Sequence, residues 1–309
     1  ALDLENSNLD QVVKMFAKAE SSYFLGVGTT FYVAKYAQYI FSELTKIHIP
    51  PISSDEFLSL ANINKKTLVF AMSQSGETFD TSSALKYSIS KGAKTAAIVN
   101  VMGSSIARMV DEVILQGSGP EICVISTKAA LSQMVILTLL AMKLGLKDKV
   151  ITKKKYQEHL ESLKELPGII QGILNERSGF IHRLANKHCK NKNWLYLGRG
   201  IYYPIALESA LKMKEVAYVH AEGMPGGFLK HGTLAMIDDD VSSIVFVPPK
   251  EKKDLYQSTI HSIEEIRARS GFVLGIHFNE QGKNHQLFSE ELILPNVPSL
   301  IAPLIQLVI

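Results

Sequence analysis

Short apolar runs alternate with segments of helical periodicity along most of the chain. The run at residues 67–72 predicts a buried strand, and the pattern at residues 79–90 predicts a helix directly after it. Further strands are predicted at residues 23–28, 95–100, 195–200, 243–247 and 272–277. Strands that alternate with helices indicate a doubly wound α/β fold, with parallel sheets covered by helices on both faces.

The two halves of the chain contain the same unit. The first strand of each half ends in Gly-x-Gly and leads into a helix, and a later helix of each half ends at a predicted C-cap glycine, Gly92 or Gly271. The offset of roughly 172 to 179 residues is about the length of one domain. We therefore expect a first domain at residues 1–146 and a second domain at residues 172–309. A charged helical connector punctuated by Pro-Gly is expected between them, at residues 147–171.

Composition narrows the class of protein. The 309 residues carry a net charge of +3 without a basic block, which argues against a nucleic-acid partner. The only cysteines, Cys123 and Cys189, lie far apart, which indicates a reducing compartment and no metal site. The apolar helix expected at 129–144 is too short and too polar for a membrane span. A cytoplasmic protein is expected. The polar start and the apolar end suggest a domain cut from a longer protein.

A turn rich in hydroxyl groups stands between the strand at 67–72 and the helix at 79–90. Its sequence is Ser73-Gln74-Ser75-Gly76-Glu77-Thr78, named here the 73–78 turn. Free backbone N–H groups and the positive end of the helix dipole make such a turn suitable for a phosphate group. No Gly-Lys-Ser/Thr ending follows, so a nucleoside triphosphate is not implied. Capping of the helix by Ser75 or Thr78 is the alternative, and the density of donors favours anion binding.

Two other polar turns precede helices in the first half. The first Gly-x-Gly lacks the third glycine of a dinucleotide fingerprint, so a tight strand-to-helix turn is favoured over a cofactor site. Its Thr29 and Thr30 could cap the helix or contact a ligand. The segment at 121–128 is interpreted as a helix cap, in which Ser126 or Thr127 could also face the same cleft.

The titratable residues gather in the second half. A helix is predicted at 204–219, and Glu208, Lys212 and Glu215 follow one another along one of its faces. Surface ion pairs are the usual explanation of such spacing. Here the helix begins at the second Gly-x-Gly turn, which places it near a candidate cleft. Glu215 is therefore a candidate general base.

A loop is predicted directly after this helix, at residues 220–232. Four glycines and a proline make it too flexible for a core, and loops on α/β scaffolds commonly carry function. His231 could act near neutral pH, whereas His220 alone is more often structural.

Taken together, these motifs resemble the tandem sugar-isomerase (SIS) domains of the glutamine–fructose-6-phosphate aminotransferase family, which serves amino-sugar biosynthesis. The resemblance covers nearly the whole chain. It rests on the 73–78 turn, on the Glu-Ser-Ala-Leu-Lys-Met-Lys-Glu run at 208–215 and on Leu-Lys-His-Gly at 229–232. The first element marks SIS domains broadly, and its combination with the other two is much more specific.

The resemblance implies a site for fructose 6-phosphate without a metal or other cofactor. The phosphate would contact Ser73, Gln74, Ser75, Thr78 and Thr30, and the sugar would be lined by Thr29, Val124 and Ser126. Glu215 would move a proton between C1 and C2, and Lys212 would assist at the hydroxyl groups. His231 would help to open the ring from a neighbouring subunit, so that a homodimer is required. A glutaminase domain would supply ammonia in the full-length protein.

The chain departs from the family pattern in three places. The glutaminase domain and the lysine-bearing C-terminal tail are not part of this sequence, and Phe228 stands where the family usually has glutamate. Two alternatives stay open: a stand-alone double-SIS deaminase or sugar-phosphate isomerase, and a non-catalytic sugar-phosphate sensor. Retention of Lys212, Glu215 and His231 argues against the sensor, because binding alone needs no base.

Overall fold

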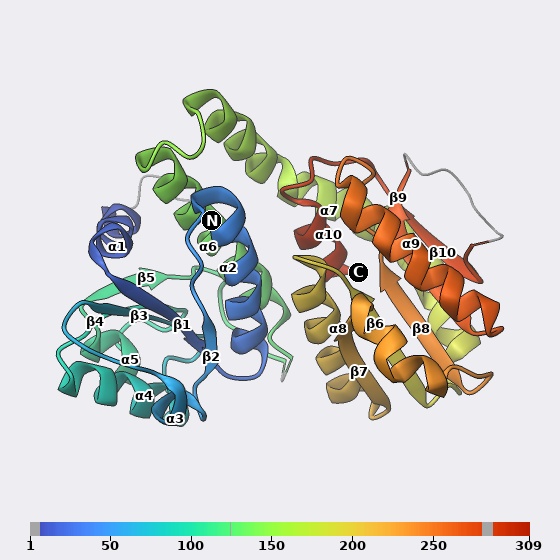
Figure 1. Cartoon of the computed structure of the whole chain (residues 1–309), viewed down its shortest axis with the longest axis horizontal. Coiled ribbons are helices and arrows are strands. Elements are labelled where there is room, and N and C mark those ends of the chain that lie inside the picture. Colours follow the sequence, from blue (N-terminus) through green and yellow to red (C-terminus); the bar gives the residue numbers. More distant parts are fainter. Residues whose placement is uncertain (1–6, 124, 280–286) are drawn as a thin grey trace. The chain divides into compact units, whose positions relative to one another are not determined.

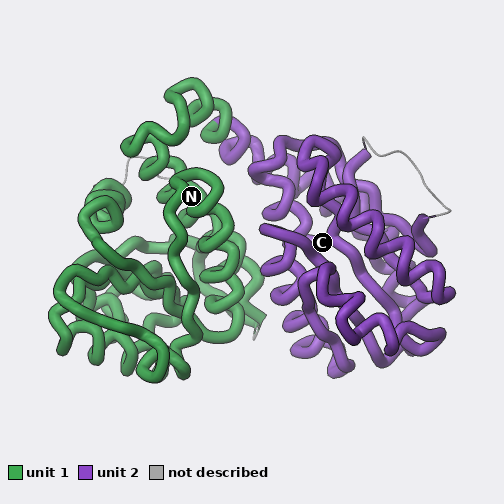
Figure 2. Tube along the Cα trace, in the orientation of Figure 1, with its two compact units in different colours: residues 1–160 green, residues 161–309 purple. Residues whose placement is uncertain are grey.

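The computed structural model describes residues 7–123, 125–279 and 287–309. The chain divides into two compact units, residues 1–160 and 161–309 (Figure 2). The division falls inside the predicted connector of residues 147–171. Each unit is built around one parallel five-stranded sheet (Figure 1).

Unit 1 is a three-layer αβα sandwich. Its strands pair in the order β2-β1-β3-β4-β5, all parallel, and are β1 (Ser21–Gly26), β2 (Pro51–Ser53), β3 (Thr67–Ser73), β4 (Lys94–Val99) and β5 (Glu112–Leu115). Its helices are α1 (Ser7–Lys18), α2 (Thr29–Thr45), α3 (Phe57–Leu60), α4 (Phe79–Ser90), α5 (Ser105–Met109) and α6 (Thr127–Lys147). Helices α1, α2 and α6 pack together, while α3 and α5 both contact α4. Four aromatic rings, Phe16, Phe24, Phe41 and Phe70, form part of the core beneath α1 and α2.

Unit 2 repeats this topology. Its strands pair in the order β10-β9-β8-β6-β7, again all parallel, and are β6 (Asn193–Gly198), β7 (His220–Pro225), β8 (Val241–Phe246), β9 (Phe272–Phe278) and β10 (Glu290–Leu294). Its helices are α8 (Tyr202–Ala217), the 3-10 helices η1 (Gly226–His231) and η2 (Thr233–Met236), α9 (Lys253–Ala268) and α10 (Ala302–Val308). In both sheets the first strand lies between the second and the third. The predicted repeat and the doubly wound α/β fold are confirmed.

Both Gly-x-Gly turns are explained by the same two steric requirements. A Cβ at Gly26 or Gly198 would lie 2.6 or 2.1 Å from backbone atoms of the following helix. Gly28 and Gly200 have φ angles of 59° and 56°, in the left-handed region that favours glycine. The first glycine of each pair therefore lets the helix approach its strand, and the second forms the turn.

The two predicted C-cap glycines differ. Gly92 follows α4 with a φ of 80°, as a left-handed cap requires. After α9 the left-handed residue is instead Ser270, with a φ of 62°. A Cβ at Gly271 would lie 2.5 Å from Cγ2 of Ile237, so this glycine is needed for close packing and the prediction of a Gly271 cap was wrong.

Helix α6 is longer than the predicted 129–144. Within the described residues it is the one helix long and apolar enough to cross a membrane by length and composition, and 78% of its most apolar stretch is buried inside the fold. It packs closely on α2, since a Cβ at Gly145 would lie 2.2 Å from the carbonyl oxygen of Leu44. Packing against α1 and α2 accounts for its apolar character.

Helix α7 (Lys153–His188) passes through Pro167 and Gly168 without interruption. The sequence predicts punctuation at this dipeptide, and that prediction was wrong. Proline removes one N–H donor from a helix, a local loss that the rest of a long helix can outweigh. Leu163, Leu166 and Ile173 are buried on both sides of the dipeptide and hold the helix in place.

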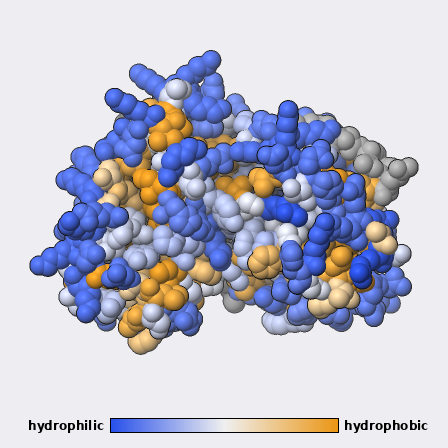
Figure 3. Space-filling model, in the orientation of Figure 1, coloured by the Kyte–Doolittle hydropathy of each residue, from blue (hydrophilic) through white to orange (hydrophobic). Residues whose placement is uncertain are grey.

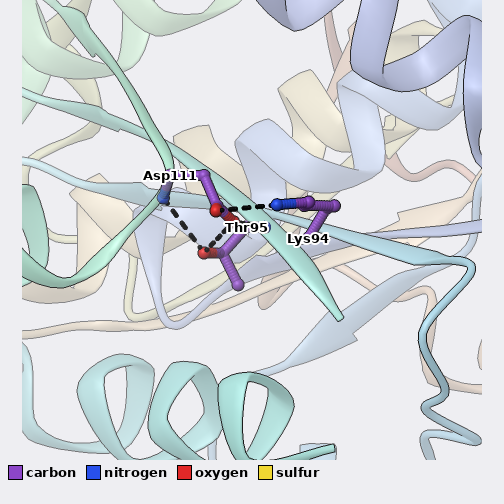
Figure 4. Close-up of polar contacts among 3 residues, drawn as sticks. All are labelled: Lys94, Thr95 and Asp111. Carbon is purple, nitrogen blue, oxygen red and sulfur yellow. Dashed lines mark hydrogen bonds and ion pairs between the residues drawn. The ribbon is translucent and has the colours of Figure 1, made fainter. Parts of the chain in front are cut away.

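A polar cluster fixes β5 against β4 at the amino ends of these strands (Figure 4). The backbone N–H of Thr95 donates to Oδ2 of Asp111 over 2.8 Å, and Lys94 Nζ lies 3.2 Å from Oδ1. Burial acts to raise the pKa of Asp111, but hydrogen bonds from Thr95 and Lys94 outweigh it and lower the pKa. This cluster lies at the edge opposite the polar turns and is structural.

Candidate functional site

The polar turns of unit 1 share the carboxyl edge of one sheet. The 73–78 turn follows β3, and the turn with Thr29 and Thr30 follows β1, which pairs directly with β3. Since β1 lies between β2 and β3, the two turns flank the point where the order of strands reverses. Ligands of open α/β sheets bind at this point.

The 73–78 turn is shaped by its own hydroxyl groups. Buried Ser73 accepts a hydrogen bond from the N–H of Gly76 at 3.0 Å, and its Oγ lies 2.9 Å from Oγ1 of Thr78. The N–H of Glu77 donates to Oγ of Ser75 at 3.1 Å. Thr78 occupies the N-cap position of α4 but makes no side-chain capping bond. Capping of α4 therefore does not explain these hydroxyls, and Gln74 lies half-buried among them.

The loop after β4 supports this turn from the side. The N–H of Ser105 donates to Oε1 of Glu77 over 2.7 Å, and the hydrogen bonds from Ser105 lower the pKa of that carboxyl. Gly76 has a φ of 67°, and a Cβ there would lie 2.0 Å from Oγ of Ser104. The negative charge of Glu77 is thus held by Ser105, outside the row of hydroxyls.

The threonines after β1 are half-buried. The hydroxyl of Thr30 donates to the carbonyl oxygen of Val27 over 2.9 Å and also accepts from the N–H of Val27. Its proton is therefore used within the turn, and a lone pair is left for another donor. Thr29 is the first residue of α2.

The loop after β5 brings a third polar segment to the same edge. Half-buried Ser126 precedes α6 and makes no side-chain cap, because Oε2 of Glu121 accepts from the N–H of Ala129 at 3.1 Å. The interpretation of this segment as a cap is correct for Glu121. Val124, the other predicted sugar contact here, lies outside the described residues.

Sequence reasoning missed Asn100, which anchors that loop. Its Nδ2 donates to the carbonyl oxygen of Gly119 over 2.7 Å, and its Oδ1 accepts from the N–H of Ser118 at 3.2 Å. The sequence contains a signal that could have identified Asn100. This polar residue stands at the carboxyl end of a buried apolar strand, at the edge of the sheet where the other polar turns lie.

The charged row on α8 is largely buried. Lys212 Nζ lies 2.7 Å from Oε2 of Glu215 and 3.3 Å from Oε1 of Glu208. Only 2% of the Glu208 side chain, 17% of Lys212 and 30% of Glu215 is exposed. Surface ion pairing is therefore excluded as the explanation of this spacing. The row places an ammonium between two carboxylates, of which Glu215 reaches solvent most.

The segment after α8 is not the flexible loop that its glycines suggest. Residues 220–225 form the edge strand β7, which pairs with β6, and residues 226–231 form η1. A Cβ at Gly223 would lie 2.6 Å from Cα of Leu207, so glycine is needed where α8 crosses the strand. His231 is exposed at the end of η1, and Phe228 is 65% exposed.

Each unit offers its own chemistry. In unit 1 the 73–78 turn presents hydroxyls and N–H groups that suit a phosphate group. In unit 2 a carboxylate lies next to an ammonium ion, a pair that suits proton transfer. Among residues 7–123, 125–279 and 287–309, no group of three His, Cys, Asp or Glu side chains is placed to hold a metal. The viewed surface is mainly hydrophilic, with small separate apolar patches (Figure 3).

The chain is similar to known proteins along nearly its whole length. A glutamine–fructose-6-phosphate aminotransferase (isomerizing) of Methanococcus maripaludis is 40% identical over 307 residues, which cover 99% of this chain and 50% of that protein. The protein of the same name from Methanocaldococcus jannaschii is 36% identical, over 97% of this chain and 26% of its own length. The chain thus spans half or less of these curated relatives.

One solved structure covers the residues of both units. The C-terminal domain of glucosamine-fructose-6-phosphate aminotransferase from Francisella tularensis has a TM-score of 0.89 at 29% identity and covers 97% of this chain and 84% of that one. The family model described as SIS domain matches residues 15–143 and 188–299, one range in each unit. The chain therefore belongs to the SIS domain family.

Proposed function

We propose that this chain is the isomerase part of a glutamine–fructose-6-phosphate aminotransferase. The observation that carries the proposal is the buried row Glu208, Lys212 and Glu215, because mere recognition of a sugar phosphate requires no base. The names of the relatives from Methanococcus and Methanocaldococcus support it. In a full-length protein, a glutaminase domain would supply the ammonia.

The phosphate of fructose 6-phosphate would bind at the 73–78 turn. Free N–H groups at the start of α4 and the helix dipole favour a dianion there. The hydroxyl of Thr30 would donate to the phosphate by exchanging the carbonyl oxygen of Val27 for a phosphate oxygen. The remaining contacts follow the resemblance: Ser73, Gln74, Ser75 and Thr78 for the phosphate, and Thr29, Val124 and Ser126 for the sugar.

Glu215 would carry the proton transfer. Its carboxylate removes a proton from C1 of the open-chain ketose while O2 gains a proton, which gives an enediol. The same proton is then returned to C2 as the O1 proton leaves, which gives the aldose. The ammonium of Lys212, 2.7 Å from Glu215, would give the proton to O2, receive the proton that leaves O1, and stabilise negative charge on these oxygens. His231, contributed by the partner subunit of a homodimer, would open the ring.

Replacement of Glu215 by Gln in the full-length protein tests the proposal. Conversion of fructose 6-phosphate to glucose 6-phosphate should fall about 10³-fold, a typical contribution of a general base, while substrate affinity survives. Exposed Glu264 on α9 supplies the matched control, since Glu264→Gln removes one charge in the same unit.

Proton transfer can be followed by the movement of deuterium from C1-deuterated fructose 6-phosphate to C2 of the product. Equal turnover of Glu215→Gln and Glu264→Gln would remove Glu215 from its role. Wild-type protein that binds the sugar phosphate without any turnover would instead favour the sensor.

A further inference from the structure

The middle residue of the second Gly-x-Gly has no part in the function proposed above. It is Arg199, where the first unit has Val27. Arg199 is half-buried, and its Nη2 donates to Oγ of Ser262 on α9 over 2.9 Å. A charged side chain therefore runs from the end of β6 to α9.

Two glycines of η1 make room for this side chain. A Cβ at Gly226 would lie 3.2 Å from Cγ of Arg199, and a Cβ at Gly227 would lie 3.3 Å from Nη1. Both distances are tighter than ordinary van der Waals contact. The Gly226-Gly227 pair, which suggests flexibility in the sequence, is thus a surface packed on Arg199.

Two further interactions connect helix α9 to η1. The hydroxyl of Ser262 lies 3.1 Å from the carbonyl oxygen of Gly226 and 3.2 Å from that of Ser258, and shares its proton between them. Lys230 Nζ lies 2.5 Å from Oε1 of Glu265. Between these points Leu229 is fully buried in the core of unit 2. The residue that follows Lys230 is His231.

The charge of Arg199 is retained in this environment. Burial lowers its pKa and the negative charge of Glu265 acts in the opposite direction, but an arginine remains protonated in proteins. Its planar fork can pack on the glycine backbone and donate to Ser262 at the same time. A lysine would place one compact ammonium there instead.

We propose that Arg199 is a positioning residue that holds η1 so that His231 is presented to the sugar ring. The inference rests on the proposed function for the role of His231. The position of Arg199 under η1 explains why unit 2 has arginine where unit 1 has valine, since unit 1 carries no corresponding histidine turn.

A double-mutant cycle in the full-length protein tests this role. Arg199→Met keeps much of the side-chain length and loses the charge, and Arg269→Met at the exposed end of α9 is the matched control. Arg199→Met should lower kcat for fructose 6-phosphate about tenfold with KM changed less than twofold. In a His231→Ala background the same substitution should change kcat less than twofold. An equal loss in both backgrounds would overturn the proposal.

Hydrogen exchange gives a readout that does not need turnover. Amides of residues 226–231 should exchange about tenfold faster in Arg199→Met and at the wild-type rate in Arg269→Met, while Arg199→Lys should restore part of the protection. Unchanged exchange in Arg199→Met would also overturn the proposal. If the wild-type protein does not convert the substrate, the proposed function fails, and the exchange result still decides whether Arg199 holds η1.

Discussion

Replacement of Gly76 by alanine perturbs the 73–78 turn at its tightest point. The φ of 67° places the residue in the left-handed region, which costs a residue with a Cβ about 1 kcal/mol. The new Cβ would also lie 2.0 Å from Oγ and 2.5 Å from Cβ of Ser104, and such overpacking costs about 1–3 kcal/mol. We expect Gly76→Ala to lower the free energy of unfolding of unit 1 by about 3 kcal/mol.

A second substitution separates the two causes. Ser104→Gly removes the atoms that the new methyl group would meet, but leaves the backbone strain at Gly76 in place. The double variant should therefore regain about 2 kcal/mol relative to Gly76→Ala, after correction for Ser104→Gly alone.

Native-state hydrogen exchange at the amides of β3 and β4 measures the stability of unit 1. Fluorescence of Trp194, the single tryptophan, reports unit 2 and should not change. A loss below about 0.5 kcal/mol in Gly76→Ala, or no rescue by Ser104→Gly, would refute the steric argument.

Three further outcomes are expected. The hydrogen bonds from Ser105 lower the pKa of Glu77, so the ionised Glu77 stabilises the folded protein. This stabilisation is present above the unfolded-state pKa of about 4.3 and is lost as the pH falls through the folded-state pKa. The melting temperature of Glu77→Gln should therefore vary less than that of the wild type between about pH 5 and 3. Lys212→Met removes the lysine that pairs with buried Glu208 and should lower the free energy of unfolding, measured in urea, by about 3 kcal/mol. Adding Glu208→Gln to this variant should restore most of the lost stability. Gly168→Ala, exposed inside α7 with no atom within 4 Å of the new Cβ, should add about 1 kcal/mol of stability in thermal unfolding.

The sequence predicts a candidate functional residue where its role depends on residues next to it in the chain. The 73–78 turn was identified because a buried strand, a row of donors and a helix start are consecutive. Burial of Glu208 and Lys212 could not be inferred, because their spacing on α8 is the same in a surface ion-pair row. The packing of Arg199 under η1 was equally hidden, since it joins residues 63 positions apart.

The sequence determined the interior of both sheets, and the tertiary structure decided their edges. All six inner strands, β1, β3, β4, β6, β8 and β9, overlap with predicted apolar runs to within two residues at each end, because a strand covered by helices on both faces is largely apolar. The edge strands β2, β5, β7 and β10 were not predicted, because they are short or half-polar and owe their form to pairing with one inner neighbour. Strand β7 leads directly into η1, which ends at His231, so the pairing of β7 with β6 contributes to the position of that residue.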